Sequence, residues 1–171
     1  VEQAARTWTQ VDPQSADAHF ELGQALYRRE RFADAIVVFR RAENLKPSRG
    51  DIRSEHGLAL AAAGELDKAE AKQRDAIDRQ PDYAAAWFRL GDVIFRRDIR
   101  RAREAADAIE KAVELERGNV VANLYLFRVA RLAQVADDDP LRARGEEAWK
   151  SVVRLHGRTQ VAAALGGAAV A

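Results

Sequence analysis

The sequence predicts a solenoid, a stack of one small structural unit repeated along the chain. Three glycines and three prolines recur at a single interval of 34 residues: Gly23, Gly57 and Gly91, and Pro13, Pro47 and Pro81. Two pairs of alanines keep the same interval, Ala35 with Ala69 and Ala42 with Ala76. A fixed period of a few tens of residues indicates that each copy buries its apolar face only against its neighbours.

The landmarks within a copy resemble those of the tetratricopeptide repeat, a helix-turn-helix of 34 residues. The first copy has Leu22-Gly23, then Ala35, Phe39 and Ala42, then Leu45 and Pro47. The third copy has Trp87, Leu90-Gly91, Ala105 and Ala112. The resemblance covers about two thirds of the chain. It implies an all-α fold, a right-handed α-solenoid of antiparallel helix-turn-helix repeats.

We expect one tetratricopeptide array over residues 1–171. Residues 1–15 are predicted to be the second helix of a truncated repeat, because the chain starts within a helical pattern and has no Met. Repeat 1 covers residues 16–49 and repeat 2 covers residues 50–83. Each has two helices separated by a short turn, which in repeat 2 contains a glycine that suits the left-handed end of a helix.

The later copies depart from the period. Repeat 3, residues 84–119, is two residues longer, and we expect residues 97–101 to absorb the insertion. Repeat 4, residues 120–158, is divergent, with Phe127 in the glycine place and a longer turn ending in Asp-Pro, which is typical of a helix start. The inner face of the helix that follows is predicted to contain Gly145, Trp149, Val152 and Leu155. Residues 159–171 are predicted to be the first helix of a truncated repeat or a capping helix.

The recurring glycines indicate close packing of helices. Gly costs a helix interior roughly 1 kcal/mol relative to Ala, so three of them in helices should have a packing role. We expect each glycine to face an alanine, which lets two helix axes approach closely. The helix over residues 67–79 offers only Ala69, Ala71, Ala76 and Ile77 for burial, and we expect it to be the inner segment that opens most readily.

Composition sets outer limits on function. The 28 basic and 27 acidic residues give a net charge of +1, which does not mark a nucleic-acid binder. No segment reaches the roughly 20 apolar residues that a membrane span needs. The chain has no Cys, which excludes disulfides and thiolate metal sites but decides no compartment. The bacterial periplasm therefore stays open, with the cytoplasm favoured.

The resemblance implies a concave wall formed by the first helix of each copy. Positions three before, one after and four after the glycine share one helical face, and others flank them. The predicted peptide-binding residues are Phe20, Gln24, Tyr27, Arg28, Ser54, Leu58, Phe88, Arg89, Asp92, Phe95, Arg96, Leu124, Arg128 and Arg131. Aromatic area and Arg forks suit a peptide with apolar anchors and a negative end. The alternative is that single rings pack against the neighbouring copy.

One use of the family is excluded by residues. Co-chaperones that hold the acidic tail of heat-shock chaperones carry Lys and Asn at set places around the glycines. Those places hold Phe20, Gln24, Glu55, Phe88 and Asp92 in this chain. The two-carboxylate clamp is absent, and the chaperone tail is not an expected partner.

Two other site classes find little support. A basic cluster at Arg96, Arg97, Arg100, Arg101 and Arg103 could meet phosphate, but 23 Arg against 5 Lys throughout the chain favours a solvated turn. The three histidines fall in separate copies, and no nucleophile and base form a recognisable pair. We therefore predict no enzyme, no metal and no cofactor in this segment.

Three functions follow from these observations. The first is a scaffold that binds a peptide or partner protein of unknown identity. The second is the non-catalytic arm of a larger glycosyltransferase, sulfotransferase or secretion component. The third is a homo-oligomer that stacks through exposed apolar faces of the terminal helices.

Overall fold

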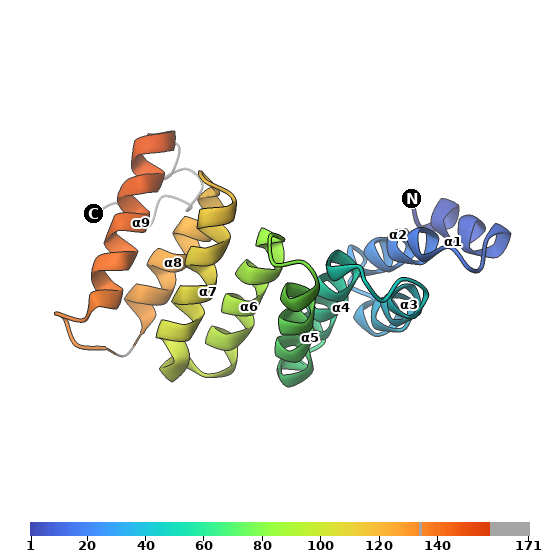
Figure 1. Ribbon diagram of the computed structural model, residues 1–171, viewed down its shortest axis with the longest axis horizontal. Helices are drawn as coiled ribbons and strands as arrows, with labels where there is room; N and C mark the ends of the chain where they lie inside the picture. The colour runs from blue at the N-terminus through green and yellow to red at the C-terminus, as the bar shows by residue number, and fades with distance from the viewer. Residues whose placement is uncertain (134, 158–171) are drawn as a thin grey trace.

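The computed structural model describes residues 1–133 and 135–157 and shows an all-α solenoid. Helices lie side by side in chain order along the long axis of the molecule (Figure 1). The bounds are α1 Glu2–Val11, α2 Ala16–Tyr27, α3 Phe32–Leu45, α4 Gly50–Ala62, α5 Leu66–Arg79, α6 Ala84–Arg97, the 3-10 turn η1 Ile99–Arg101, α7 Ala102–Leu115, α8 Val120–Leu132 and α9 Pro140–His156. The segment 159–171 lies outside the described residues.

Each copy is an antiparallel pair. We call α2, α4, α6 and α8 the first helices, and α3, α5, α7 and α9 the second helices. Their most extensive contacts join α2 to α3, α4 to α5, α6 to α7 and α8 to α9. Each second helix also packs against the next first helix, and α1 packs against α2. The first helices begin at Ala16, Gly50, Ala84 and Val120.

A hydrogen bond fixes the start of three first helices. His19, Arg53 and Trp87 stand 34 residues apart, and each side chain reaches the carbonyl of the proline six residues before it. The nitrogen to oxygen distances are 3.1, 2.8 and 2.8 Å. Three unlike side chains thus bond to the equivalent proline carbonyl in three successive turns, which a search for identical residues does not detect.

The turns follow the predicted pattern. Gly64 has a φ of 84°, and Glu30, one period earlier, takes the same left-handed region with a φ of 59°. The two extra residues of repeat 3 form part of η1, as expected from the sequence. Asp139 caps α9 by accepting a hydrogen bond from the Leu141 amide at 2.9 Å, and Pro140 is the first residue of the helix.

The glycines face larger side chains than we expected. A Cβ on Gly23 would lie 2.6 Å from the Phe39 ring, and one on Gly91 would lie 2.5 Å from Cγ1 of Ile109. In repeat 2 the corresponding neighbour of Gly57 is Nε2 of Gln73, at 2.5 Å. Each glycine therefore makes room for one long side chain of the second helix, and the prediction that it faces an alanine is corrected.

In repeat 4, different residues bring the two helices close together. Phe127 stacks on Trp149 of α9, with ring centroids 5.2 Å apart. The close approach moves to Gly145, where a Cβ would lie 2.4 Å from that of Ala130. Val152 is buried as predicted, whereas Leu155 is 55% exposed and does not belong to the inner face.

Polar side chains form much of the packing in repeat 2. Gln73 is fully buried on α5, where its amide accepts a hydrogen bond from the Ser54 hydroxyl at 2.8 Å and donates to the Ser54 carbonyl at 2.9 Å. Arg89 of α6 donates to the same hydroxyl at 2.8 Å. These bonds join α4, α5 and α6, and they compensate for the few apolar residues of α5, of which Ala71 is exposed.

Two buried carboxylates extend this polar packing. Glu43 of α3 accepts hydrogen bonds from His56 at 2.8 Å and Lys72 at 2.6 Å, and it also pairs with Arg53. Burial raises the pKa of Glu43, but the bonds from His56 and Lys72 outweigh it and hold the pKa at about 2. Glu70 of α5 accepts from Arg101, Arg97 and Arg74. The bond from Arg101, opposed by burial and joined by the other two, holds its pKa at about 2.

Replacing Gly23 with Ala tests the close packing. Ala favours a helix over Gly by about 1 kcal/mol, so an open site would be stabilised. We expect the opposite, a loss of about 1 to 3 kcal/mol in the free energy of unfolding measured by urea, because the added methyl overpacks against Phe39. Combining Gly23→Ala with Phe39→Leu should cost less than the sum of the two single changes. A stabilised Gly23→Ala variant would contradict this packing.

Stability should fall in acid. Both carboxyls have a pKa in the folded state below the ordinary value of 4.5. Their stabilisation is therefore present above about pH 4.5 and is lost as the pH falls toward 2, by about 2 to 3 kcal/mol for each group. Urea unfolding between pH 6 and pH 3 should show this loss, and Glu43→Gln should reduce its pH dependence. An unchanged pH dependence in Glu43→Gln would exclude this carboxylate as the cause.

Candidate functional site

Two hollows lie along the first helices, one toward each end of the array. The first has a volume of about 440 Å³ between α1 and α2, and the second has about 560 Å³ along α8. Of the predicted binding residues, Phe20 lines the first hollow, and Leu124, Arg128 and Arg131 line the second. The other predicted residues lie between these ends, on α2, α4 and α6.

The hollow on α8 combines apolar surface with two cations. Val121 and Leu132 are 64% and 50% exposed, which is unusual for large aliphatic side chains. The Arg128 guanidinium lies over the Tyr125 ring at 5.6 Å, and that of Arg131 lies over the Phe127 ring at 5.8 Å. Each ring holds an arginine by a cation–π contact, so the charges are placed at the rim of an apolar surface.

The hollow between α1 and α2 is more polar. Trp8 is 43% exposed there, and the Arg49 guanidinium lies 5.4 Å from the centroid of the Phe20 ring. Asp17 and Asp51 both pair with Arg49, and Asp17 also pairs with Lys46. The carboxylates of Asp17 and Asp51 are thus neutralised within the chain.

The middle of the predicted wall is occupied by contacts between helices. Ser54 is fully buried, and its hydroxyl bonds to side chains of α5 and α6. The prediction that Ser54 contacts a ligand is therefore corrected. Arg89 also donates to Glu55 at 2.7 Å. Asp92 accepts from the Tyr125 hydroxyl and, at 3.3 Å, from Arg96. Burial and the bond to Asp92 both raise the pKa of Tyr125.

The remaining predicted residues divide between packing and surface. Phe88 packs edge-on against Tyr125 with centroids 5.4 Å apart, and Tyr27 lies 5.4 Å from Phe32. Phe95 packs against the largest core cluster. The three others have free surface: Gln24 and Leu58 are half-buried and Arg28 is exposed. Phe88 contacts the neighbouring copy through Tyr125, as the alternative describes, whereas Tyr27 contacts Phe32 of its own copy.

The sequence rule missed several residues of the hollows. Val121, Tyr125, Phe127 and Leu132 fall outside the three positions that the rule selected around the glycine place. Trp8 belongs to a copy that lacks a first helix and so has no glycine to set the register. The signal that could have found them is the cluster of large apolar residues in the sequence of α8.

All five arginines of the basic cluster form ion pairs within the chain. Arg97 and Arg101 pair with Glu70, and Arg101 also pairs with Glu104. The other members pair with Asp92, Asp98 and Asp139. Arg97, Arg101 and Arg103 pair with carboxylates of other elements, whereas the pair of Arg96 lies within α6 and that of Arg100 lies within the turn.

The described residues contain no group of three or more His, Asp or Glu side chains arranged to hold a metal ion. Within the same part of the chain, no helix combines the length and the apolar character that crossing a bilayer requires.

Comparison with known sequences identifies the family. A family model of the tetratricopeptide repeat matches residues 1–50 and 54–120. The chain belongs to the tetratricopeptide repeat family. The matched residues make up about two thirds of the chain.

Two curated tetratricopeptide relatives match parts of the chain. The TPR repeat-containing thioredoxin TTL4 of Arabidopsis thaliana is 35% identical over 74 residues, which is 43% of this chain and 11% of the relative. The heat-shock protein cognate co-chaperone sgt12 of Aspergillus fumigatus is 31% identical over 94 residues, which is 55% of this chain and 27% of the relative. The matched segments therefore span about a tenth and about a quarter of these relatives' lengths.

Solved structures confirm the fold. MamA superposes with a TM-score of 0.76 at 19% identity, covering 93% of this chain and 88% of MamA. YrrB, described as a TPR protein with an unusual peptide-binding site, has a TM-score of 0.70 at 15% identity, with 97% and 81% covered. The first TPR of Spaghetti, bound to an HSP90 peptide, has a TM-score of 0.65 at 22% identity, with 70% and 94% covered. At such identities the likeness shows the fold alone.

Proposed function

We propose that this array is a protein-interaction scaffold that binds a peptide or a partner protein along its first helices, with the hollow on α8 as the main contact. The observation that carries the proposal is the exposed apolar surface of Val121, Leu124 and Leu132, bordered by Arg128 and Arg131. A monomeric protein gains nothing in stability from such exposed side chains, whereas an interface uses them.

The chemistry of the hollow sets the kind of ligand. The aliphatic side chains supply area for one or two apolar anchors. The guanidinium groups present forks that pair with carboxylates. An extended or helical segment with apolar side chains next to an Asp, a Glu or a terminal carboxylate therefore fits this surface. Both arginines are exposed, so they are accessible to such a partner.

The similar proteins support binding of peptides in general. YrrB and the Spaghetti domain are both described with a bound peptide or a peptide site. The chaperone tail itself is not the expected ligand of this chain. The places where co-chaperones carry their clamp hold Phe20, Gln24 and Asp92 among others, and Asp92 would repel a carboxylate.

We further propose that the segment itself is not catalytic. Tetratricopeptide arrays generally serve as scaffolds, and the titratable clusters of repeat 2 are built into helix packing. Because the curated relatives are much longer than the matched part, the array also fits the role of a non-catalytic arm of a larger enzyme or of a secretion component.

Self-association is a second candidate, favoured by apolar surface toward both ends. Val11 of α1 is 79% exposed and Trp8 is 43% exposed, while Val121 and Leu132 are exposed on α8. Stacking of one copy on another through these surfaces would cover them.

Photocrosslinking tests both candidates in one experiment. In one variant of the array, a benzophenone amino acid replaces Val121. The control variant carries it in place of Lys111 on α7. Each variant is irradiated in an extract of the organism that makes the protein. We expect a defined partner band from the first position alone. The double change Arg128→Glu and Arg131→Glu should lower its yield roughly tenfold, because reversed charges repel the partner's carboxylates.

Each outcome separates the candidates. A band at twice the mass of the array would support self-association in place of a separate partner. Equal bands from both positions would contradict binding at the hollow on α8. A crosslinking yield that is unchanged by the double charge reversal would contradict it as well.

A further inference from the structure

Side chains of successive second helices pair in three places, between α3 and α5, α5 and α7, and α7 and α9, which we call the first, second and third grooves. The repeat allows the same positions to be compared in each groove. Arg40, Arg74 and Glu110 are each the ninth residue of their second helix. Lys68 and Glu104 are each the third residue of the helix that follows across the groove.

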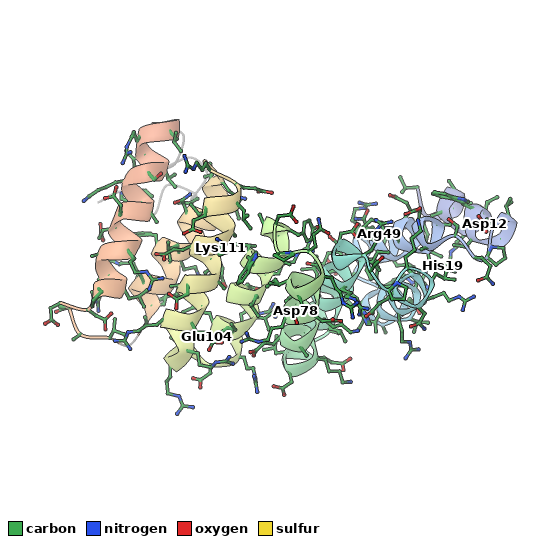
Figure 2. The ribbon with its side chains drawn as sticks, viewed as in Figure 1. Asp12, His19, Arg49, Asp78, Glu104 and Lys111 are labelled. Carbon is green, nitrogen blue, oxygen red and sulfur yellow. The ribbon has the colours of Figure 1, made fainter. Side chains whose placement is uncertain are left out.

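Opposite charges close the second and third grooves. Arg74 of α5 donates a hydrogen bond to Glu104 of α7 at 2.6 Å, and Figure 2 labels Glu104 on that helix. In the third groove Glu110 of α7 accepts from Arg144 of α9 at 2.6 and 2.8 Å. Each of these ion pairs joins two successive second helices directly.

The first groove differs from the second at two equivalent positions, although Glu43 of α3 and Lys72 of α5 form an ion pair elsewhere in it. The positions of Arg74 and Glu104 are held there by Arg40 and Lys68, which are both cations. Both side chains line a hollow of about 540 Å³ between α3 and α5. Ile36, Leu60 and Ala71 give this hollow an apolar part.

The two cations are available to a ligand. Among the described residues, no carboxylate is within ion-pair distance of Arg40. Lys68 pairs only with Glu65, three residues before it, and the Lys68 side chain is 72% exposed. An exposed pair of this kind contributes little to stability, so a partner's carboxylate can replace it. Lys72, by contrast, is held by Glu43 and is part of the folded core.

We propose that the hollow between α3 and α5 binds an acidic segment of a partner protein. One carboxylate of that segment lies between Arg40 and Lys68 and takes the place that Glu104 has in the next groove. An adjacent apolar side chain contacts Ile36, Leu60 and Ala71. Glu65 and Asp75 also line the hollow, where Glu65 pairs with Lys68 and Asp75 pairs with Arg53. The charge complementarity that favours a carboxylate therefore comes from Arg40 and Lys68. This surface is separate from the hollow on α8.

Titration with a defined peptide tests the proposal. The probe is the end-blocked hexapeptide acetyl-Glu-Leu-Glu-Glu-Leu-Glu-amide, added to the isotope-labelled array and followed by amide chemical shifts. The matched probe has Gln in place of every Glu. We expect the acidic peptide alone to shift the amides of residues 36–40, 56–60 and 68–72.

Charge reversal locates the site. Lys68→Glu should weaken the acidic peptide about tenfold, because the introduced carboxylate pairs with Arg40 and repels the peptide. The control is Lys111→Glu on α7 (Figure 2), because Lys111 also has an exposed ion pair with a residue three positions away, Glu114. Both side chains are exposed, and an unchanged helical circular dichroism spectrum shows that each variant folds. No shifts at millimolar peptide, equal weakening in both variants, or equal binding of the Gln peptide would each overturn the proposal.

Discussion

The array depends on one contact that recurs in repeats 1 to 3, where a long side chain of the second helix lies against a glycine of the first. Phe39, Gln73 and Ile109 fill this position, and no side chain other than hydrogen fits opposite them. The contact fixes the distance between the paired helices, and with it the rows of side chains that each pair presents to its neighbours. The hollow between α3 and α5 lies between two such pairs, whereas the hollow on α8 belongs to repeat 4, where Gly145 lies against Ala130 instead.

The interior of the array is linked by charge as well as by apolar contact. Around Glu43, Gln73 and Glu70, hydrogen bonds join α3, α4, α5, α6 and the turn η1. The exposed apolar side chains toward the ends of the array, and the cations Arg40 and Lys68 of the first groove, lie outside this network. The surfaces that we propose for binding are thus places where contacts between the repeats leave apolar or charged side chains exposed.

Much of the fold could be predicted from the sequence because glycine, proline and alanine recur in phase. The residue opposite each glycine could not be predicted from the sequence, because Phe, Gln and Ile belong to different chemical classes. Ser54 was assigned to the wall because the helical rule gives its direction and not its hydrogen bonds. The hollow on α8 was found only in part, because Phe127 replaces the glycine that sets the register and Tyr125 lies outside the rule. The remaining wall residues stay predictions.

Native-state hydrogen exchange of the intact chain measures the central claim most directly. If Gln73 binds α5 to α4 through Ser54 and lies against Gly57, the amides of the two helices open together and have similar protection. Residues 66–79 should then not exchange ahead of residues 50–62, despite the few apolar side chains of α5. Exchange of α5 at least about tenfold faster than α4 would show that the two helices open separately, and would contradict a stack held together at this position.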